Sequence, residues 1–187
     1  IRDGRFIGHN TDFSGFASAL ATGLPGAKLD RVVQLGAGGA GSAVAYALLT
    51  AGVRQLDLVD TDAARCAARA AELAGFFPGS IVTARTTAEL PELMPLADGL
   101  VHCTPVGMAA HPGVPLETSL LEPRHWVADI VYFPLETELL RVAAAKGCRV
   151  VNGGGMAIFQ AVGAFRLFTG LEPDPARMRR HFASLGS

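Results

Sequence analysis

The chain has 187 residues and a formal net charge of −1, and half of its residues are hydrophobic, which is enough material for one or two domains with a real core. This balance offers no broad electrostatic surface for nucleic acid or for an anionic membrane, and the apolar runs are too short and too interrupted to cross a bilayer as helices. Three widely spaced cysteines without metal-ligand spacing predict reduced thiols in a cytoplasmic protein, not disulfides or a metal site.

Strand-length apolar runs alternate with helical patterns through the middle of the chain, which is typical of an α/β protein with a parallel sheet. Before them we expect a connecting strand over 5–12 and an amphipathic helix over 12–24. A last helix is expected from Met156. Its apolar residues at helical spacing are predicted to join the core, with packing against a partner domain as the alternative: Phe159, Val162, Phe165 and Phe168. Between these ends the sequence predicts strands over 31–36, 55–60, 80–84, 99–105, 125–132 and 148–153, and helices over 41–52, 62–75, 87–98 and 137–147.

Residues 36–41 read GAGGAG and fit the motif G-x-G-x-x-G between a predicted strand and a predicted helix. In this context Gly36 permits a tight turn, Gly38 lets the backbone approach a diphosphate, and Gly41 allows close packing of helix and strand. The helix N-terminus adds free N–H groups and a partial positive charge. The loop therefore predicts dinucleotide binding.

Asp60 ends the second predicted strand, at the expected spacing of about 20 residues after the glycine motif. A carboxylate there accepts hydrogen bonds from both ribose hydroxyls of NAD and repels the 2′-phosphate of NADP, so NAD is the favoured coenzyme. Arg65 follows one helical turn later. It is expected either to stack on the adenine or to pair with Asp62.

Other polar residues stand at places that ligands use. Thr11 or Asp12 is a good N-cap for the first helix. Thr104 follows the fourth strand, at the carboxyl edge where open α/β sheets bind ligands. His102 is expected to be a satisfied residue at a strand end, with a proton relay as the alternative. Gln160 is a polar residue in an otherwise apolar helix, which alone indicates little.

Taken together these stretches resemble the C-terminal part of shikimate/quinate dehydrogenases. The similarity is carried by GHNTDFSGF, LGAGGAGSAV, CTPVGM, DIVYFPLETELLRVAAAKGC and GGGMAIFQAVGAFRLFTGLEP, which follow the family's order over nearly the whole chain. The stretch VDTDAAR is especially similar to the NAD-using actinobacterial quinate/shikimate branch. The resemblance implies a Rossmann-like doubly wound parallel sheet with flanking helices. It also implies hydride transfer between a dinucleotide and a small cyclohexane or cyclohexene carboxylic acid, without metal.

The resemblance also assigns roles. It implies that Asp12 is catalytic and binds the substrate hydroxyl, with Gln160 and Tyr132 as further substrate contacts. The residues it implies for the coenzyme are Gly36, Ala37, Gly38, Gly39, Ala40, Asp60, Arg65, Thr104, Val106, Gly153 and Met156. His102-Cys103 stands where the family commonly has Asn-Ala, and Phe159 where the close branch commonly has His, so the exact substrate stays open.

The family's catalytic lysine belongs to an N-terminal α/β domain, and neither Lys28 nor Lys146 matches it. The first residue is Ile, and we expect the chain to be the coenzyme-binding part of a longer enzyme, poorly active by itself. The expected division is a connecting segment over 1–24, a dinucleotide-binding domain over 25–155, and helices over 156–187 that pack toward the substrate domain.

Two alternatives remain. One is a dehydrogenase of the same fold with another substrate, as in methylene-tetrahydrofolate dehydrogenases or glutamyl-tRNA reductases. The other is a non-catalytic dinucleotide-binding paralogue or a truncated fragment. The assembly is also open, with a homodimer as one option.

Overall fold

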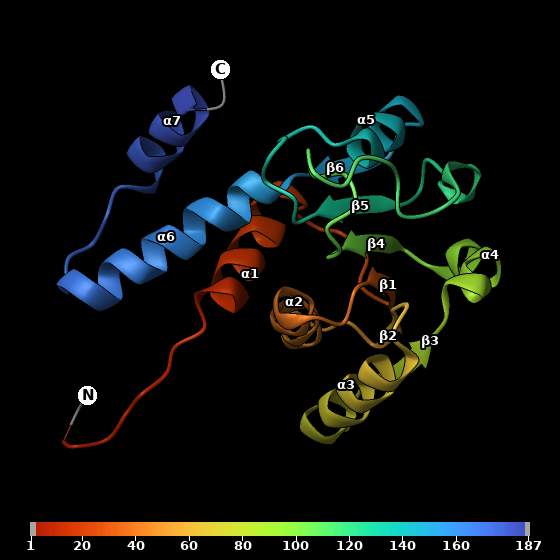
Figure 1. Cartoon of the computed structure of the whole chain (residues 1–187), viewed down its shortest axis with the longest axis horizontal. Helices are drawn as coiled ribbons and strands as arrows, with labels where there is room; N and C mark the ends of the chain where they lie inside the picture. The colour runs from red at the N-terminus through yellow and green to blue at the C-terminus, as the bar shows by residue number, and fades with distance from the viewer. Residues whose placement is uncertain (1–2, 186–187) are drawn as a thin grey trace.

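The computed structural model describes residues 3–185 of the chain (Figure 1). The outermost residues of both predicted end segments, 1–2 and 186–187, lie outside this range. The strands are β1 (Arg31–Leu35), β2 (Gln55–Val59), β3 (Ile81–Arg85), β4 (Gly99–His102), β5 (Trp126–Asp129) and β6 (Arg149–Val151). The α-helices are α1 (Thr11–Gly23), α2 (Gly39–Thr50), α3 (Ala63–Phe76), α4 (Leu90–Leu93), α5 (Glu138–Ala145), α6 (Gly153–Thr169) and α7 (Pro175–Leu185), and short 3-10 turns are η1 (Thr87–Glu89), η2 (Met94–Leu96) and η3 (Thr118–Leu120).

All six strands run parallel in one sheet with the order β3-β2-β1-β4-β5-β6. The chain starts in the middle at β1, builds one half through β2 and β3, and then builds the other half from β4. Leu35 at the end of β1 pairs with Val59 and with His102, so the carboxyl ends of the central strands share one edge. Open α/β sheets bind ligands at this edge, where the winding direction changes between β1 and β4. The predicted doubly wound sheet is confirmed.

Alternate strand residues face opposite sides of the sheet and enter separate cores. Val32 and Val101 belong to one core with residues of α1, α2, α3 and α6. Val33 and Leu100 belong to the other core with residues of α4 and α5. Helices α4 and α5 accordingly lie on the opposite side of the sheet from α1 and α2 (Figure 1). Both faces are covered, which explains why the strands read as continuous apolar runs.

Helices α1 and α6 lie side by side, in contact through small residues (Figure 1). A Cβ on Gly15 would lie 2.8 Å from the carbonyl oxygen of Met156, and a Cβ on Gly163 would lie 3.2 Å from the methyl group of Thr11. Glycine at these positions lets the two helix backbones approach closely. No helix within the described range is both long and apolar enough to cross a bilayer.

The strand predicted over residues 5–12 is wrong. Residues 6–10 have no regular structure, and α1 already begins at Thr11. A strand needs a neighbour for its backbone N–H and C=O groups, and no strand of the described sheet pairs with this segment. The capping prediction is also wrong by one residue, because Asn10 is the N-cap and its side chain accepts the N–H of Asp12 at 2.9 Å.

The C-terminal helix differs from the prediction in two ways. It starts at Gly153, because the Asn152 side chain caps it by accepting the N–H of Gly154 at 3.1 Å. The core prediction holds for Val162, but Phe165 is 40% exposed and Phe168 is 87% exposed. The far half of α6 extends beyond the sheet, with the start of α1 beside it (Figure 1).

Candidate functional site

The glycine loop follows β1 directly and turns into α2. Gly36 has a φ of +101°, in the left-handed region that favours glycine, and its N–H donates to the carbonyl oxygen of Val59 at 2.7 Å. A Cβ on Gly41 would lie 2.3 Å from the carbonyl oxygen of Gly36, so a side chain there would push α2 away from the loop. The structure therefore shows the predicted tight turn at Gly36 and the predicted close packing at Gly41.

The outer side of the same loop is open. No heavy atom lies within 4 Å of a Cβ built on Gly38 or on Gly39, among the residues that the structure describes. Gly38 is the N-cap of α2 and offers no side-chain hydrogen bond to the first turn. Uncapped N–H groups at a helix N-terminus attract anions. Residues 36–40, which include Ala37 and Ala40, therefore fit the diphosphate of a dinucleotide.

Gln34 braces this loop from within β1, which the sequence analysis did not anticipate. Its side chain is fully buried, and Nε2 donates to the carbonyl oxygens of Gly36 and Gly41 at 2.9 and 2.8 Å. The sequence does contain a signal for this role, a single amide residue in an otherwise apolar strand. A buried amide needs hydrogen-bond partners, so its neighbours could have been sought. Gln34 ties the turn to the start of α2.

Asp60 lies at the end of β2, directly against the glycine loop. Its Oδ2 accepts the N–H of Ala37 at 2.7 Å, while Oδ1 accepts the N–H of Asp62 at 2.9 Å and a guanidinium N–H of Arg65 at 2.7 Å. Burial by itself would raise the pKa of Asp60, but these donors together hold that pKa below its usual value. Asp60 is therefore a carboxylate at neutral pH.

Arg65 pairs with both nearby aspartates. Its guanidinium lies 2.7 Å from Asp60 and 3.2 Å from Asp62, and nearly half of the side chain is exposed. The expected pairing with Asp62 is present, and the pairing with Asp60 was not foreseen. The end of β2 thus combines a buried carboxylate with an accessible positive charge.

The loop after β4 approaches the glycine loop from the other side of β1. A Cβ on Gly36 would lie 2.6 Å from the carbonyl oxygen of Cys103 and 3.2 Å from the methyl group of Thr104. Thr104 Oγ1 accepts the N–H of Val106 at 3.3 Å. The predicted coenzyme residues Thr104 and Val106 therefore lie in the loop that crosses the glycine motif at the switch between β1 and β4.

His102 is fully buried at the end of β4 and has partners on both ring nitrogens. Nδ1 lies 2.9 Å from Asp129 Oδ1, and Nε2 lies 2.5 Å from Thr104 Oγ1. Asp129 also accepts from the hydroxyl of Thr137 at 2.7 Å. The prediction of a satisfied strand-end histidine is confirmed. The sequence analysis missed Asp129 and Thr137, because their pairing with His102 depends on the adjacency of β4 and β5.

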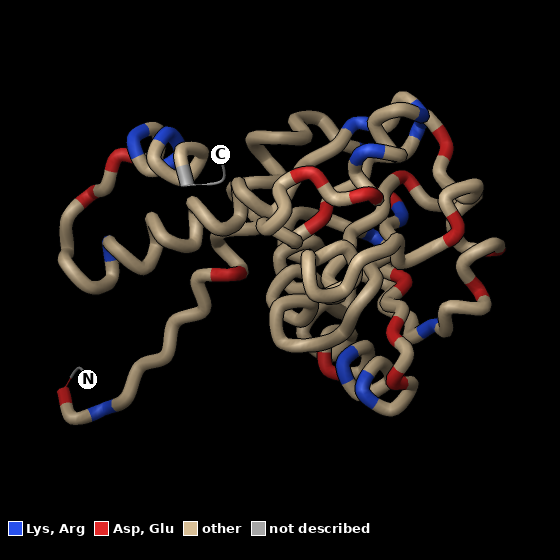
Figure 2. Tube along the Cα trace, turned by 45° about the horizontal axis from the view of Figure 1, so that its top comes forward, with Lys and Arg blue, Asp and Glu red and all other residues tan. Residues whose placement is uncertain are grey.

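The structure brings Gln160 close to the first turns of α1. A Cβ on Gly15 would lie 3.0 Å from the backbone nitrogen of Gln160 and 3.2 Å from its Cβ, one helical turn after Asp12. Apart from Asp12 and Arg166, these two helices carry no Asp, Glu, Lys or Arg, and most of their trace is uncharged in Figure 2. Among the described residues, the carboxylate of Asp12 and the amide of Gln160 have no hydrogen-bond partner.

Three further predicted residues follow the carboxyl ends of β5 and β6. Tyr132 is 55% exposed, and among the described residues no hydrogen bond joins it to Asp12 or Gln160. Gly153 packs against the chain after β5, since a Cβ there would lie 2.3 Å from the carbonyl oxygen of Ile130. Met156 is buried in the core with α1 and α2. Gly153 and Met156 therefore have packing roles, and contact with a coenzyme stays a prediction.

Comparison with known proteins agrees with this geometry. The model of the Shikimate 5′-dehydrogenase C-terminal domain matches residues 153–181. Shikimate dehydrogenase (NADP(+)) of Arthrobacter sp. (strain FB24) is 82% identical over 185 residues, which are 99% of this chain and 63% of that protein. Quinate/shikimate dehydrogenase (NAD(+)) of Corynebacterium efficiens is 54% identical over 183 residues, which are 98% of this chain and 64% of that protein.

A solved structure gives the same result for the fold. Quinate dehydrogenase from Corynebacterium glutamicum in complex with NAD matches with a TM-score of 0.91 and 52% identity, covering 95% of this chain and 63% of that one. Of the two relatives compared by sequence, the more similar is named for NADP and the other for NAD. The 187 residues span a little under two thirds of the length of these relatives, and by sequence and fold the chain belongs to the shikimate/quinate dehydrogenase family.

Proposed function

We propose that this chain supplies the coenzyme-binding part of an oxidoreductase that interconverts shikimate with 3-dehydroshikimate, quinate with 3-dehydroquinate, or both. The observation that carries the proposal is the open glycine loop at Gly38 and Gly39, with the Asp60 carboxylate bound to the N–H of Ala37 in the same loop. The names of the relatives support the substrate class. A cytoplasmic location is part of the same proposal.

For the coenzyme we propose NAD. The Asp60 carboxylate lies where an adenosine ribose would meet the end of β2, and it is ionised, so it favours two ribose hydroxyls over a 2′-phosphate. The accessible guanidinium of Arg65 is the feature that favours NADP, since guanidinium groups bind phosphate well. Because Arg65 already pairs with Asp60 and Asp62, its charge is partly neutralised, and we therefore propose NAD as the preferred coenzyme.

For the reaction we propose that Asp12 holds the reacting ring hydroxyl and that Gln160 binds a second hydroxyl. When bound, the nicotinamide ring supplies the site to which hydride is transferred. Asp12 has no competing partner among the described residues, so its carboxylate is available to accept the proton of that hydroxyl. Gln160, on the adjoining helix, orients the ring by hydrogen bonds. Tyr132 is proposed to contact the substrate from the loop after β5.

Neither lysine of the chain is placed to assist Asp12. Lys146 Nζ donates to the carbonyl oxygens of Thr118 and Leu121 at 2.6 and 3.1 Å, which gives it a structural role. The Lys28 carbonyl accepts the indole N–H of Trp126 at the amino end of β5, away from the carboxyl edge. We therefore propose that the 187 residues alone bind the dinucleotide without turning over substrate at an ordinary rate.

Calorimetric titration with NAD and NADP tests the proposal. We expect the wild-type chain to bind NAD about tenfold more tightly than NADP, because the ionised Asp60 repels the additional phosphate (about 1.4 kcal/mol). Asp60→Asn should remove most of this preference. Asp62→Asn is the matched control: it also removes a negative charge beside Arg65, but leaves the carboxylate at the end of β2, and asparagine caps α3 equally well.

Three outcomes would contradict the proposal at different levels. Tighter binding of NADP by the wild type would reject the choice of coenzyme alone. Absence of binding by either dinucleotide would reject the proposed function. Turnover of shikimate or quinate by the 187 residues at about 10 s⁻¹, an ordinary enzymatic rate, would reject the proposed inactivity of the chain by itself.

A further inference from the structure

A chain of buried hydrogen bonds runs from α5 through β5 and β4 to the carboxyl edge of the sheet. Thr137 Oγ1 donates to Asp129 Oδ2 at 2.7 Å, and the distances from His102 to Asp129 and to Thr104 are 2.9 and 2.5 Å. Thr137, Asp129 and His102 are each 1% exposed or less. Only Thr104, at the end of the chain of bonds, is partly exposed. The network therefore has a single outlet, next to the glycine loop.

The direction of each hydrogen bond follows from Asp129. Its carboxylate receives the hydroxyl of Thr137 and, at 3.0 Å, the N–H of Val131, in addition to the contact with His102. A carboxylate can only accept, so Nδ1 carries a hydrogen, and an imidazole ring with one hydrogen carries it there. Nε2 is then an acceptor. The hydroxyl of Thr104 has one proton and must donate it inward to Nε2.

We propose that His102 and Asp129 are positioning residues that turn the Thr104 hydroxyl into an acceptor at the carboxyl edge of the sheet, beside the glycine loop. One lone pair of Oγ1 receives the N–H of Val106, and the other is left for a ligand. Such an oxygen attracts N–H or O–H donors and repels phosphate oxygens. It therefore selects the nicotinamide-riboside half of the coenzyme, whose carboxamide and hydroxyl groups are donors.

The position of Thr104 supports this assignment, which rests on the proposed function. Thr104 approaches Gly36 from the β4 side of β1, while Asp60 approaches the same loop from the β2 side. A dinucleotide whose diphosphate meets the glycine loop extends to both sides. If Asp60 holds the adenosine, the other half of the molecule lies toward Thr104.

His102→Asn and Thr104→Val test whether these side chains orient a hydrogen bond to the coenzyme or only stabilise the fold. In His102→Asn the amide nitrogen takes the place of Nδ1 and still donates to Asp129, but no acceptor remains for the Thr104 hydroxyl. Thr104→Val removes the hydroxyl at similar size, and Thr104→Ser keeps it. Thr50→Val is the matched control, because the Thr50 hydroxyl donates to the Tyr46 carbonyl on the exposed end of α2.

The first measurement is the ¹⁵N spectrum of the histidine rings, with His102 assigned by the signal that His102→Asn removes. The second is the affinity for NADH and for ADP, which lacks the nicotinamide-riboside half. We expect Nδ1 to be protonated and Nε2 to be bare. We expect His102→Asn and Thr104→Val each to weaken NADH about three- to tenfold with ADP unchanged, and the double variant to be no weaker than the poorer single one. Thr104→Ser and Thr50→Val should bind as the wild type does.

A protonated Nε2, unchanged NADH affinity in Thr104→Val, or an equal loss for ADP would each overturn the inference while the proposed function stands. A wild type that binds neither NADH nor ADP would overturn the proposed function and the inference with it. Thermal unfolding of each variant shows whether a loss comes from the fold, and the comparison of NADH with ADP in His102→Asn still decides the question if Thr104→Val does not fold.

Discussion

The glycines of the loop over residues 36–41 have different roles. Gly41 is required by the protein itself, since a side chain would meet the backbone of Gly36 at 2.3 Å. Gly39 has nothing within 4 Å of its Cβ position among the described residues, so the fold does not need glycine there. A position that the fold leaves open at a helix N-terminus is where an outside group can approach the backbone. The motif therefore divides into a part that the fold requires and a part that the fold leaves open, which we propose binds the ligand.

Alanine at each position should separate these parts. Gly41→Ala is expected to destabilise the chain by about 1–3 kcal/mol, because the overlap is with rigid backbone, and to lower the midpoint of thermal unfolding. Gly39→Ala should leave stability unchanged or raise it by up to about 1 kcal/mol, since alanine favours the helix. It should nevertheless weaken NADH binding. A stable Gly41→Ala, or a Gly39→Ala that binds NADH as the wild type does, would contradict this division.

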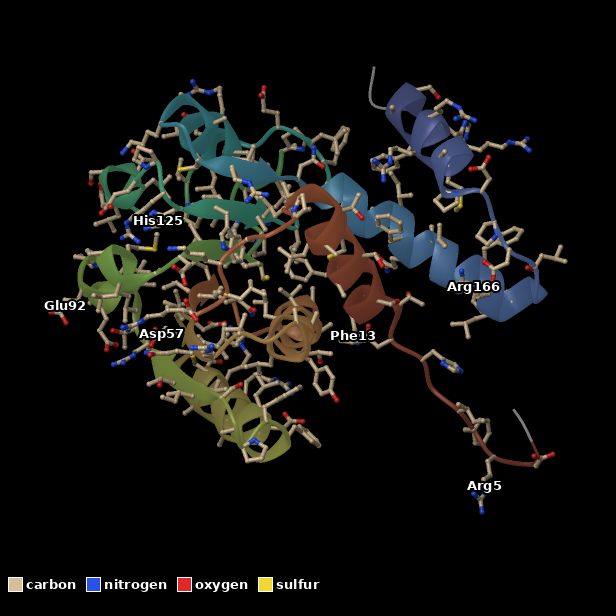
Figure 3. The ribbon with its side chains drawn as sticks, turned by 180° about the vertical axis from the view of Figure 1, so that it is seen from behind. Arg5, Phe13, Asp57, Glu92, His125 and Arg166 are labelled. Atoms are coloured by element: carbon tan, nitrogen blue, oxygen red, sulfur yellow. The ribbon has the colours of Figure 1, made fainter. Side chains whose placement is uncertain are left out.

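At the scale of elements, one buried aspartate joins three strands. Asp57 on β2 is fully buried, and its carboxylate lies 2.8 Å from Arg31 of β1 and 3.1 Å from Arg85 of β3. Figure 3 shows Asp57 at the end of the sheet away from α6. Both arginines are largely covered, so the charges are weakly screened. Loss of the Asp57 carboxylate would leave the guanidinium groups of Arg31 and Arg85 without the negative charge that they share.

Asp57→Asn is expected to lower the free energy of unfolding by about 2–3 kcal/mol, because it breaks two partly buried ion pairs at once. The matched control is Asp30→Asn. Asp30 pairs with Arg54 at 3.4 Å, but both side chains are mostly exposed, so the loss should stay below about 0.5 kcal/mol. Urea unfolding of the two variants provides the comparison, and equal losses would show that burial does not set the strength of the Asp57 pairs.

At the scale of the whole molecule, one histidine links stability to pH. His125 is buried before β5, where Nδ1 accepts the N–H of Glu122 at 3.1 Å and Nε2 donates to the Met94 carbonyl at 3.0 Å (Figure 3). Burial lowers the pKa of His125, and the neighbouring Arg124 lowers it further. The folded chain thus holds the ring neutral. The unfolded chain binds a proton more readily.

Stability from His125 should be complete above its unfolded pKa of about 6.5 and should be lost as pH falls through the lower pKa of the folded state. We expect the free energy of unfolding to decline below pH 6.5, by up to about 1.4 kcal/mol per pH unit from this residue. His125→Gln should remove that slope, and His181→Gln, on the exposed face of α7, should not. If the free energy of unfolding still declined below pH 6.5 in His125→Gln, other titratable groups would be the cause of the decline.

Much of this molecule could be predicted from short stretches of sequence. The five-residue strand β1 and the glycine loop were foreseen because hydrophobic pattern and glycine requirements act over a few neighbouring residues. The close of the helix predicted over 137–147 was foreseen for the same reason, since α5 ends at Ala145 and Gly147 follows it with a φ of +89°. The strand over 5–12 failed because a strand depends on a partner that local pattern does not contain.

The sequence by itself determined the fold class and the family resemblance, and it singled out the glycines and the acidic residue that we propose for dinucleotide binding. Only the tertiary structure decided that Asp60 binds Ala37 and Arg65, that Gln34 braces the loop, and that His102 joins Asp129 to Thr104. It also decided that Phe165 and Phe168 lie outside the core. The physical reason is that residue types and spacing set local backbone choices, whereas hydrogen-bond partners and burial depend on which strands and helices become neighbours in space.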